Sequence, residues 1–408
     1  MPAPNQILIY AELLSNIRQV TVACSLPTPS SSGTKAIIST DGQQLLVVHD
    51  GARQSLTMPE RVSAPSMLPI PQPGTTNLAW RLPLGTATTA RPALTPEAAT
   101  PWSAQDVQPG SGVRCGACDA TIVATDVLRE WKNLPSENWA EMMEFWHCHK
   151  PQIRKHDDGE GHLQSRGYGA TSRIAAQSAV GFVDLTSFML SDTDIVQSSI
   201  TGDIVESSTA SRNLVPENIM HKGRASDAVP IRCSACNHQL GVQNQEMASV
   251  SLFKWEVAIT ERSQQLAPSR PTLPQCFSAM LLATMARSGS SKSVIIPMKT
   301  QAQQTARRSP DQALLNIWLF NGNITFSSTS ESGSPLGAVK VFYRMVSQVD
   351  ANEMLDSMTS NVQDILLPPG TIEVVKDKLR VSSHCMPQSD RKFKEWSIGL
   401  LERWVSEG

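Results

Sequence analysis

Val113-Arg-Cys-Gly-Ala-Cys-Asp119 recurs further along the chain as Ile231-Arg-Cys-Ser-Ala-Cys-Asn237. Each stretch holds a Cys-x-x-Cys pair and is followed by an aliphatic residue, Ile122 or Leu240. Such a pair is typical of a zinc knuckle, a tight turn that directs two thiolates to one ion. Because zinc prefers four ligands in a tetrahedron, the two turns together predict one shared site, with the ligands Cys115, Cys118, Cys233 and Cys236.

A long stretch of chain separates the two pairs, whereas ordinary zinc ribbons place them roughly 15 to 20 residues apart. We therefore expect one structural zinc ion to join two distant parts of a domain, with other segments inserted between them. Four thiolates leave no open coordination position, and such a site contributes on the order of 10 kcal/mol to folding. The alternative is two unrelated pairs, free or redox-active, although the sequence pattern lacks the βαβ setting of a thioredoxin-like pair.

The composition is that of a globular protein with insertions. The chain has 408 residues, of which 40% are hydrophobic and 18% charged, and a net charge of −2. The length predicts two or three domains, and the charge argues against a general nucleic-acid binder. Eight cysteines are too sparse for a disulfide scaffold. With no secretory signal pattern and no apolar run long enough for a membrane span, we expect a soluble cytoplasmic or nuclear protein.

Strands dominate the predicted fold class, which is α+β. Short β-prone runs between turn signals fill the chain up to Leu84 and predict antiparallel pairing. We expect an N-terminal β-rich, zinc-containing domain over 1–249 and a C-terminal domain of mixed α+β structure over 250–408. Within the first domain, stretches rich in Ala, Thr, Pro, Ser or Gly predict disordered insertions at about 85–112, 150–173 and 187–212.

Local patterns predict individual elements in the C-terminal domain. Asn321-Gly322-Asn323 between two apolar runs indicates a hairpin. The remaining expectations are strands over 251–259, 339–346 and 372–381, a helix over 277–287, and a terminal helix whose apolar face carries Phe393, Trp396, Leu400 and Trp404.

A helix is also expected between the two Cys-x-x-Cys pairs. Pro135-Ser136 offers its N-cap, and its apolar stripe consists of Trp139, Met142, Met143 and Trp146. It ends at His147-Cys148-His149, where Cys148 is a candidate catalytic thiol activated by an imidazole. The alternatives are a second metal site with His156 or His162, or a helix end that packs and bonds its last carbonyls.

Three further cysteines complete the set of thiols. Cys385 follows His384 and is either a second candidate for a thioester-forming nucleophile or an incidental cysteine near a strand end. Cys24 and Cys276 stand in apolar contexts and are expected in the core.

The stretch between the two pairs also carries a family resemblance. Leu134-Pro-Ser-Glu-Asn-Trp139 followed by Trp146-His-Cys-His-Lys-Pro151 resembles the HECT-like ubiquitin-conjugating-enzyme-binding proteins. Val339-Lys-Val-Phe-Tyr-Arg344 and Cys236-x-x-x-Leu240-Gly241 are compatible with that family, and the resemblance runs from about Ile7 to Val405.

The resemblance implies a ubiquitin-pathway protein. It implies binding of a ubiquitin-conjugating enzyme and of ubiquitin, and activity as a ubiquitin-protein ligase. Because fungal relatives are linked to pre-mRNA cleavage and polyadenylation, it also implies, as an alternative, a non-catalytic scaffold or chaperone-like factor for that machinery. The family's Cys-His carries over to Cys148 and His149. Candidate partner-binding residues are Leu134, Pro135, Ser136, Glu137, Asn138, Trp139, Trp146 and His149.

Overall fold

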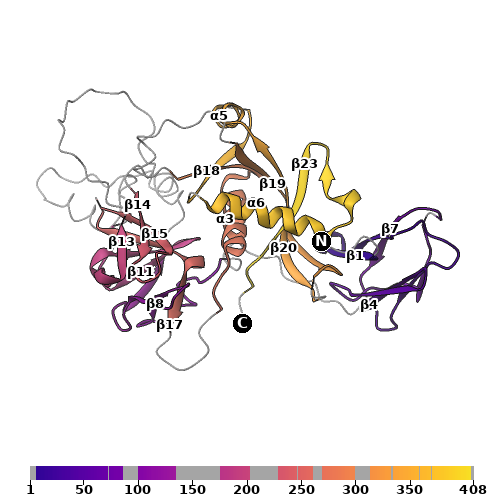
Figure 1. The fold of residues 1–408 in the computed structure, drawn as a ribbon, viewed down its shortest axis with the longest axis horizontal. Helices are drawn as coiled ribbons and strands as arrows, with labels where there is room; N and C mark the ends of the chain where they lie inside the picture. The colour runs from indigo at the N-terminus through magenta and orange to yellow at the C-terminus, as the bar shows by residue number, and fades with distance from the viewer. Residues whose placement is uncertain are drawn as a thin grey trace, which may run out of the picture. The chain divides into compact units, whose positions relative to one another are not determined.

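A computed structural model describes residues 6–71, 73–85, 100–134, 175–202, 228–245, 247–260, 269–298, 313–331, 334–357, 359–368 and 370–405. These residues form two compact units (Figure 1). The first unit combines Met1–Pro101, Leu273–Met298 and Arg308–Gly408, and the second lies within Trp102–Thr272. Most elements are strands in antiparallel sheets, so the expected strand-dominated class is confirmed.

A nine-stranded sheet joins the two ends of the chain in the first unit. β1 and β19 pair antiparallel, with Tyr10 opposite Ser328, so the first hundred residues share a sheet with the last hundred. For this reason the chain does not divide between residues 249 and 250, where the sequence placed the domain boundary. The strands are β1 (Leu8–Leu14), β2 (Gln19–Ser25), β7 (Asn77–Pro83), β18 (Lys292–Pro297), β19 (Leu314–Ser328), β20 (Leu336–Val346), β21 (Val362–Leu367), β22 (Lys392–Phe393) and β23 (Trp396–Glu402).

A second, four-stranded sheet contributes to the first core of this unit. It consists of β3 (Lys35–Ile38), β4 (Gln44–His49), β5 (Ala52–Thr57) and β6 (Met67–Leu68). Alternate residues of β1 and β4, among them Ile9 and Leu45, are buried in one cluster between the sheets. Tyr10 points to the opposite face of β1 and belongs to another cluster with Phe326 and Trp396. β1 is therefore buried on both faces, as its predominantly apolar sequence requires.

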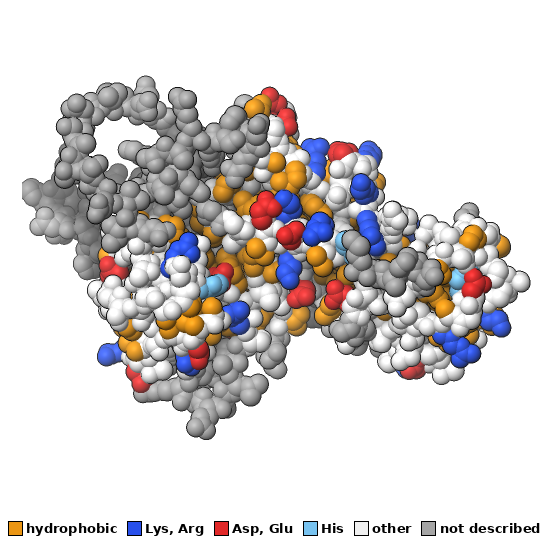
Figure 2. All heavy atoms as spheres, in the orientation of Figure 1, with side chains coloured by type: hydrophobic (Ala, Val, Ile, Leu, Met, Phe, Trp, Pro, Cys, Tyr) orange, Lys and Arg blue, Asp and Glu red, His pale blue; other side chains and the backbone are white. Residues whose placement is uncertain are grey.

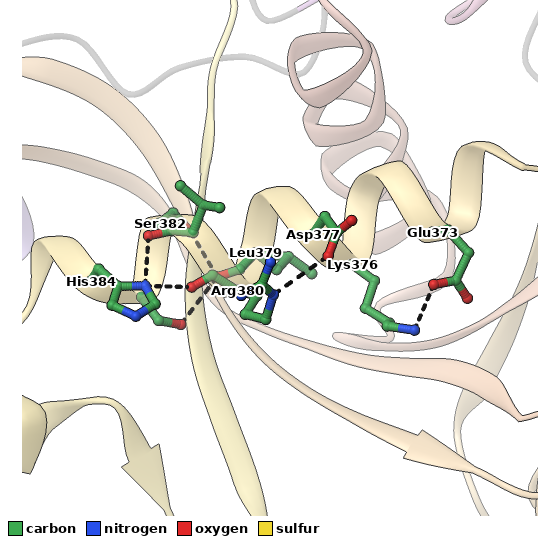
Figure 3. Close-up of polar contacts among 9 residues, drawn as sticks. Glu373, Lys376, Asp377, Leu379, Arg380, Ser382 and His384 are labelled. Carbon is green, nitrogen blue, oxygen red and sulfur yellow. Dashed lines mark hydrogen bonds and ion pairs between the residues drawn. The ribbon is translucent and has the colours of Figure 1, made fainter. Parts of the chain in front are cut away.

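Helices pack on the C-terminal strands of the first unit. They are α3 (Leu273–Ser288), α5 (Gln348–Asp356) and α6 (Thr371–Ser382). α6 lies so close to β23 that a Cβ atom at Gly399 would approach the Leu379 side chain to 2.8 Å. The outer face of α6 carries ion pairs between Lys376 and Glu373 and between Arg380 and Asp377 (Figure 3). Basic and acidic side chains are accordingly intermixed over this part of the surface (Figure 2).

The second unit contains a seven-stranded and a three-stranded sheet. β16 (Ser249–Phe253) leads through a single short turn into β17 (Val257–Thr260), so one segment contributes to both sheets. The rings of Trp102 and Trp131 contact Phe188 in the core, with centroids 6.0 Å and 5.1 Å away. The other strands are β8 (Gly112–Cys115), β9 (Thr121–Val123), β10 (Glu130–Asn133), β11 (Val180–Val183), β12 (Ser187–Ser191), β13 (Ile200–Gly202), β14 (Ala228–Cys233) and β15 (Gln239–Asn244).

Short 3₁₀ helices connect several strands. They are η1 (Ser15–Ile17), η3 (Asp192–Asp194), η4 (Gln197–Ser199), η5 (Lys254–Glu256), η6 (Ser383–Cys385) and η7 (Gln388–Asp390). Among the described residues, no helix combines the length and apolar character that crossing a bilayer demands.

Three local predictions in the C-terminal part are wrong. The expected hairpin is a single strand, β19, because its register shifts on both sides of Asn321 and absorbs the turn-like residues as bulges. The expected terminal helix forms β22 and β23, since Trp396, Ile398 and Leu400 alternate onto one buried face beside β20. The strand expected over 372–381 is α6, which buries Val375 and Leu379 at helical spacing. The strand expected over 251–259 is interrupted by η5. The helix expected over 277–287 is confirmed as part of α3, and the strand expected over 339–346 is confirmed as part of β20.

Parts of the expected insertions are ordered. Residues 187–202 form β12, η3, η4 and β13. Trp102, which falls in the first expected insertion, is 1% exposed and stacks on Phe188. A Ser- or Pro-rich composition therefore does not indicate disorder where a few large apolar residues reach the core. Residues 86–99, 150–173 and 203–212 lie outside the described part of the chain.

Candidate metal centre

Two hairpin turns of the second unit have the same backbone geometry. β8 ends at Cys115 and β9 begins at Thr121, while β14 ends at Cys233 and β15 begins at Gln239. In the first turn the Asp119 amide donates to the Cys115 carbonyl over 2.9 Å, and in the second Asn237 donates to Cys233 over 2.8 Å. Asp119 and Asn237 both have positive φ, 65° and 60°. This conformation explains why Asp or Asn follows each second cysteine.

An arginine closes each turn. Arg114 Nε donates to the Asp119 carbonyl over 2.9 Å, and Arg232 Nη1 donates to the Asn237 carbonyl over 3.3 Å. The repeated Arg-Cys-x-x-Cys sequence therefore encodes a repeated structure, with the arginine as part of it.

The four sulfur atoms of these turns meet at one point. Cys115 Sγ lies 3.7 Å from Cys236 Sγ, and Cys118 Sγ lies 3.6 Å from Cys233 Sγ. All four ligand atoms are within 4.8 Å of one another. Four sulfurs around a tetrahedral ion with Zn–S bonds of about 2.3 Å would be about 3.8 Å apart. The spacing fits a metal ion and is far longer than a disulfide bond of about 2.05 Å.

The electrostatics of the cluster also favour a cation. Burial raises the pKa of Cys115. The pKa of Cys118 is lowered to about 7, chiefly because the Ala120 amide donates to its sulfur and also because of the Cys236 thiol. Four thiolates this close repel one another, so full ionisation requires a positive charge between them. Cys115 and Cys233 are buried, whereas Cys118 and Cys236 are exposed.

Residues around the first turn that the sequence did not single out hold it in place. The Gly116 amide donates to the Glu256 carbonyl over 2.8 Å, and Arg270 Nη1 donates to the Gly116 carbonyl over 2.7 Å. A Cβ atom at Gly116 would clash with Arg270 Nη1 and lie 2.7 Å from the Glu256 oxygen. In the sequence, the second turn has Ser234 at the position of Gly116, so the turn itself does not require glycine. This difference is the one sequence signal that Gly116 has close neighbours outside its own turn.

A hydrogen-bonded pair of side chains continues this shell around the cluster. His238 Nε2 lies 2.5 Å from Glu256 Oε2. His238 directly follows the second turn, and the carbonyl of Glu256 accepts the hydrogen bond from Gly116 in the first turn. Glu256 therefore contacts both turns.

The signature stretch lies largely outside the described residues. Of the candidate partner-binding residues, only Leu134 is described, and its amide donates to the Val183 carbonyl over 2.8 Å. Cys148 lies outside the described residues with the others, which are Pro135, Ser136, Glu137, Asn138, Trp139, Trp146 and His149. The expected helix over this stretch and the role of Cys148 therefore stay predictions.

Cys385 is buried, at 3% exposed. Burial and then the charge of Glu331 raise the pKa of this thiol to about 12, and Cys385 Sγ lies 3.4 Å from Glu331 Oε1. A thiol in this environment stays protonated, which does not favour a nucleophilic role. Cys24 and Cys276 are buried, as expected.

The fold and this centre define a β-rich protein in which four cysteines from two distant hairpins can hold a metal ion. The chain belongs to the family described as HECT-like ubiquitin-conjugating enzyme (E2)-binding, whose model matches residues 12–398. The resemblance noted in the sequence is thus confirmed.

Two fungal proteins are similar to the chain. An uncharacterized protein of Schizosaccharomyces pombe is 23% identical over 321 residues, covering 76% of this chain and 79% of its own length. An uncharacterized protein of Saccharomyces cerevisiae is 22% identical over 302 residues, covering 73% and 71%. No solved structure matches the chain.

Proposed function

We propose that the protein binds a ubiquitin-conjugating enzyme and acts as a ubiquitin-protein ligase. The observation that carries this proposal is the match of the E2-binding family over residues 12–398, which spans both compact units. Binding of the conjugating enzyme follows from the family description, and ligase activity is the further step.

We assign zinc to the four-cysteine cluster, with a structural role. Thiolates are soft ligands that suit zinc, and four of them leave no position for a substrate water. The ion would hold the β8–β9 hairpin to the β14–β15 hairpin, so its contribution to function is a rigid second unit.

The chemistry of ubiquitin transfer can follow two routes. In the covalent route a cysteine thiolate attacks the thioester carbonyl of the charged conjugating enzyme. That enzyme's cysteine then leaves as a thiolate, and ubiquitin is carried on a new thioester. Cys148 is the first candidate for this cysteine. Cys385 is the second candidate, but its thiol is buried and stays protonated, which disfavours attack on a thioester. In the other route the protein only positions the charged enzyme.

A discharge assay separates these routes. Purified protein is incubated with a panel of ubiquitin-charged conjugating enzymes, and the products are resolved on non-reducing gels. A thiol-sensitive ubiquitin adduct that disappears in Cys148→Ser but remains in Cys385→Ser supports the covalent route. Accelerated discharge without an adduct supports positioning. If no conjugating enzyme binds or discharges faster than in the protein's absence, the proposed function is wrong.

The alternative function is a non-catalytic scaffold or chaperone-like factor for the pre-mRNA cleavage and polyadenylation machinery. It is favoured by the absence of reactive thiols among the described residues outside the four-cysteine cluster, where Cys24, Cys276 and Cys385 are all buried. Quantitative affinity purification tests it: subunits of that machinery should co-purify with wild type and with Cys148→Ser alike. Their failure to exceed background would exclude this alternative.

A further inference from the structure

Three phenylalanine rings form a stack on one face of the nine-stranded sheet. Phe320 of β19 stacks on Phe342 of β20 with centroids 4.7 Å apart and planes at 12°. Phe393 of β22 stacks on Phe342 with centroids 5.5 Å apart and planes at 30°. Phe342 is 5% exposed, whereas Phe320 and Phe393 are 54% and 45% exposed. We call these three residues the phenylalanine stack.

Two tryptophans fix the base of the stack. Trp318 meets Phe342 edge-on at 5.2 Å and Trp396 at 6.0 Å. Trp396 and Phe342 belong to the buried cluster of the C-terminal strands, so the stack stands on a packed core. Rings held this way lose little further freedom when a partner covers them.

Cations surround the same rings. Lys292 Nζ lies 5.4 Å from the Trp318 centroid, Arg344 Cζ lies 4.6 Å from that of Trp396, and Lys394 Nζ lies 5.7 Å from that of Phe393. Arg344 is paired with Glu395 at 3.5 Å. Within the described part of the chain, neither Lys292 nor Lys394 forms an ion pair. The face is therefore apolar at its centre and positive at its rim.

We propose that the phenylalanine stack is a docking surface for a polypeptide segment that carries aliphatic or aromatic side chains flanked by aspartate or glutamate. The apolar side chains cover the exposed parts of Phe320 and Phe393, where a large apolar area is otherwise left in water. The flanking carboxylates approach Lys292 and Lys394, and they also meet the positive edges of the aromatic rings. This surface goes beyond the proposed function, because it does not depend on binding of the conjugating enzyme.

A single-stranded nucleic acid is the other class of partner that aromatic rings and cations suggest. Nucleic-acid bases stack on free ring faces, but Phe342 already stacks with two neighbours and Lys394 Nζ lies over the Phe393 ring. Of the three rings, Phe320 is therefore the one best placed to accept a base, which is too little for a stacking platform. Binding through phosphates also relies on many cations, and the chain has a net charge of −2. The observations therefore favour a polypeptide.

Selection from a displayed library of random peptides tests the proposal on the full-length protein. The library is selected on wild type, and the enriched peptides are measured by fluorescence anisotropy against wild type and against Phe320→Ala/Phe393→Ala. We expect peptides with apolar residues beside Asp or Glu, bound at least about tenfold more weakly by the double variant. A Val374→Ala/Val381→Ala variant removes two exposed apolar side chains from α6 instead and should bind as wild type does.

A second variant distinguishes a loss of docking from a loss of folding. Lys292→Glu/Lys394→Glu leaves all rings in place and should weaken the same peptides while gaining affinity for peptides with Lys in the flanks. The proposal is overturned if no enriched peptide depends on Phe320 and Phe393, if the enriched flanks are basic, or if charge reversal changes nothing. Stack-dependent binding of a single-stranded oligonucleotide that displaces the peptides would assign the surface to nucleic acid and overturn it equally.

Discussion

Cys118 Sγ and Cys233 Sγ lie 3.6 Å apart, although their residues belong to different hairpins separated by 115 positions in the chain. No backbone pairing joins β8–β9 directly to β14–β15 among the strand pairs of the described residues, since they lie in separate sheets. The sulfur cluster is thus a link between the two sheets in addition to the direct connection from β16 to β17, and an ion within it would strengthen that link.

Loss of a ligand should release the metal and loosen the second unit. We expect wild type to contain one zinc ion per chain by elemental analysis, and Cys233→Ser to contain none. The thermal unfolding midpoint should fall in Cys233→Ser and, to a similar extent, in wild type treated with a chelator, because metal binding energy is folding energy here. Cys276→Ala is the matched control: it removes a buried thiol elsewhere and should keep the full zinc content.

Gly116 should be far less tolerant than the equivalent residue of the second turn. Gly116→Ala places a Cβ atom 2.7 Å from the Glu256 carbonyl oxygen and should cost about 1–3 kcal/mol. Ser234→Ala only removes the hydroxyl bond to the Ser198 carbonyl and should cost about 1 kcal/mol. Denaturant unfolding measures both. Equal losses would show that the contacts of Gly116 with Glu256 and Arg270 do not matter.

The ion pair between the buried Glu12 and the partly exposed Lys340 should be sensitive to loss of one partner. Lys340 Nζ lies 2.7 Å from Glu12 Oε2, and the Tyr10 hydroxyl donates to the same oxygen over 2.7 Å. Lys340→Met leaves a buried carboxylate with one partner fewer and should lower the unfolding free energy by about 3–5 kcal/mol. Adding Glu12→Gln should restore part of that loss. Additive losses in this double-mutant cycle would mean that the pair is not coupled.

Alkaline pH should destabilise the first unit. Burial raises the pKa of Cys24 and that of Cys385 to about 12 each, above their usual value of 9. The folded state then keeps these protons between about pH 9 and 12, while the unfolded state has released them. The unfolding free energy therefore falls as pH rises through this window, by up to about 1.4 kcal/mol per pH unit for each thiol. Cys24→Ala should flatten the slope measured by denaturant titration, and an unchanged slope would contradict the assignment.

Alkylation tests the reactivity of the Cys385 thiol independently. With its pKa near 12, folded wild type should leave Cys385 unmodified by iodoacetamide at pH 8, where an ordinary exposed thiol reacts. Glu331→Gln removes the negative charge that helps to raise this pKa and should increase modification, because the pKa then falls. Mass spectrometry of the tryptic peptides resolves Cys385 from the exposed Cys118 and Cys236. Rapid modification of Cys385 in folded wild type would restore it as a nucleophile candidate.

The clustering of the four cysteines could be predicted from sequence because its signal is local and repeated. Two short turns carry all four cysteines, and each turn is closed by hydrogen bonds between its own residues. The shell around it could not be predicted, since Arg270 reaches Gly116 from a segment that the sequence does not mark. The same limit applies to the fold. Asn321-Gly322-Asn323 has the composition of a turn, but β20 beside β19 and Leu282 of α3 next to Gly322 keep the strand continuous.

The pairing of β1 with β19 has a consequence for how the protein folds during translation. Ile9 donates its amide to the Thr329 hydroxyl across 320 positions of the chain. At ribosomal rates of about 5–20 residues per second, β1 waits roughly 15–65 s for its partner to be synthesised. During that time β2 can cover one edge of β1, while the other edge and the face that carries Tyr10 and Glu12 stay uncovered. We therefore expect the second unit to fold first on the ribosome, and the nascent first unit to need a chaperone until translation is complete.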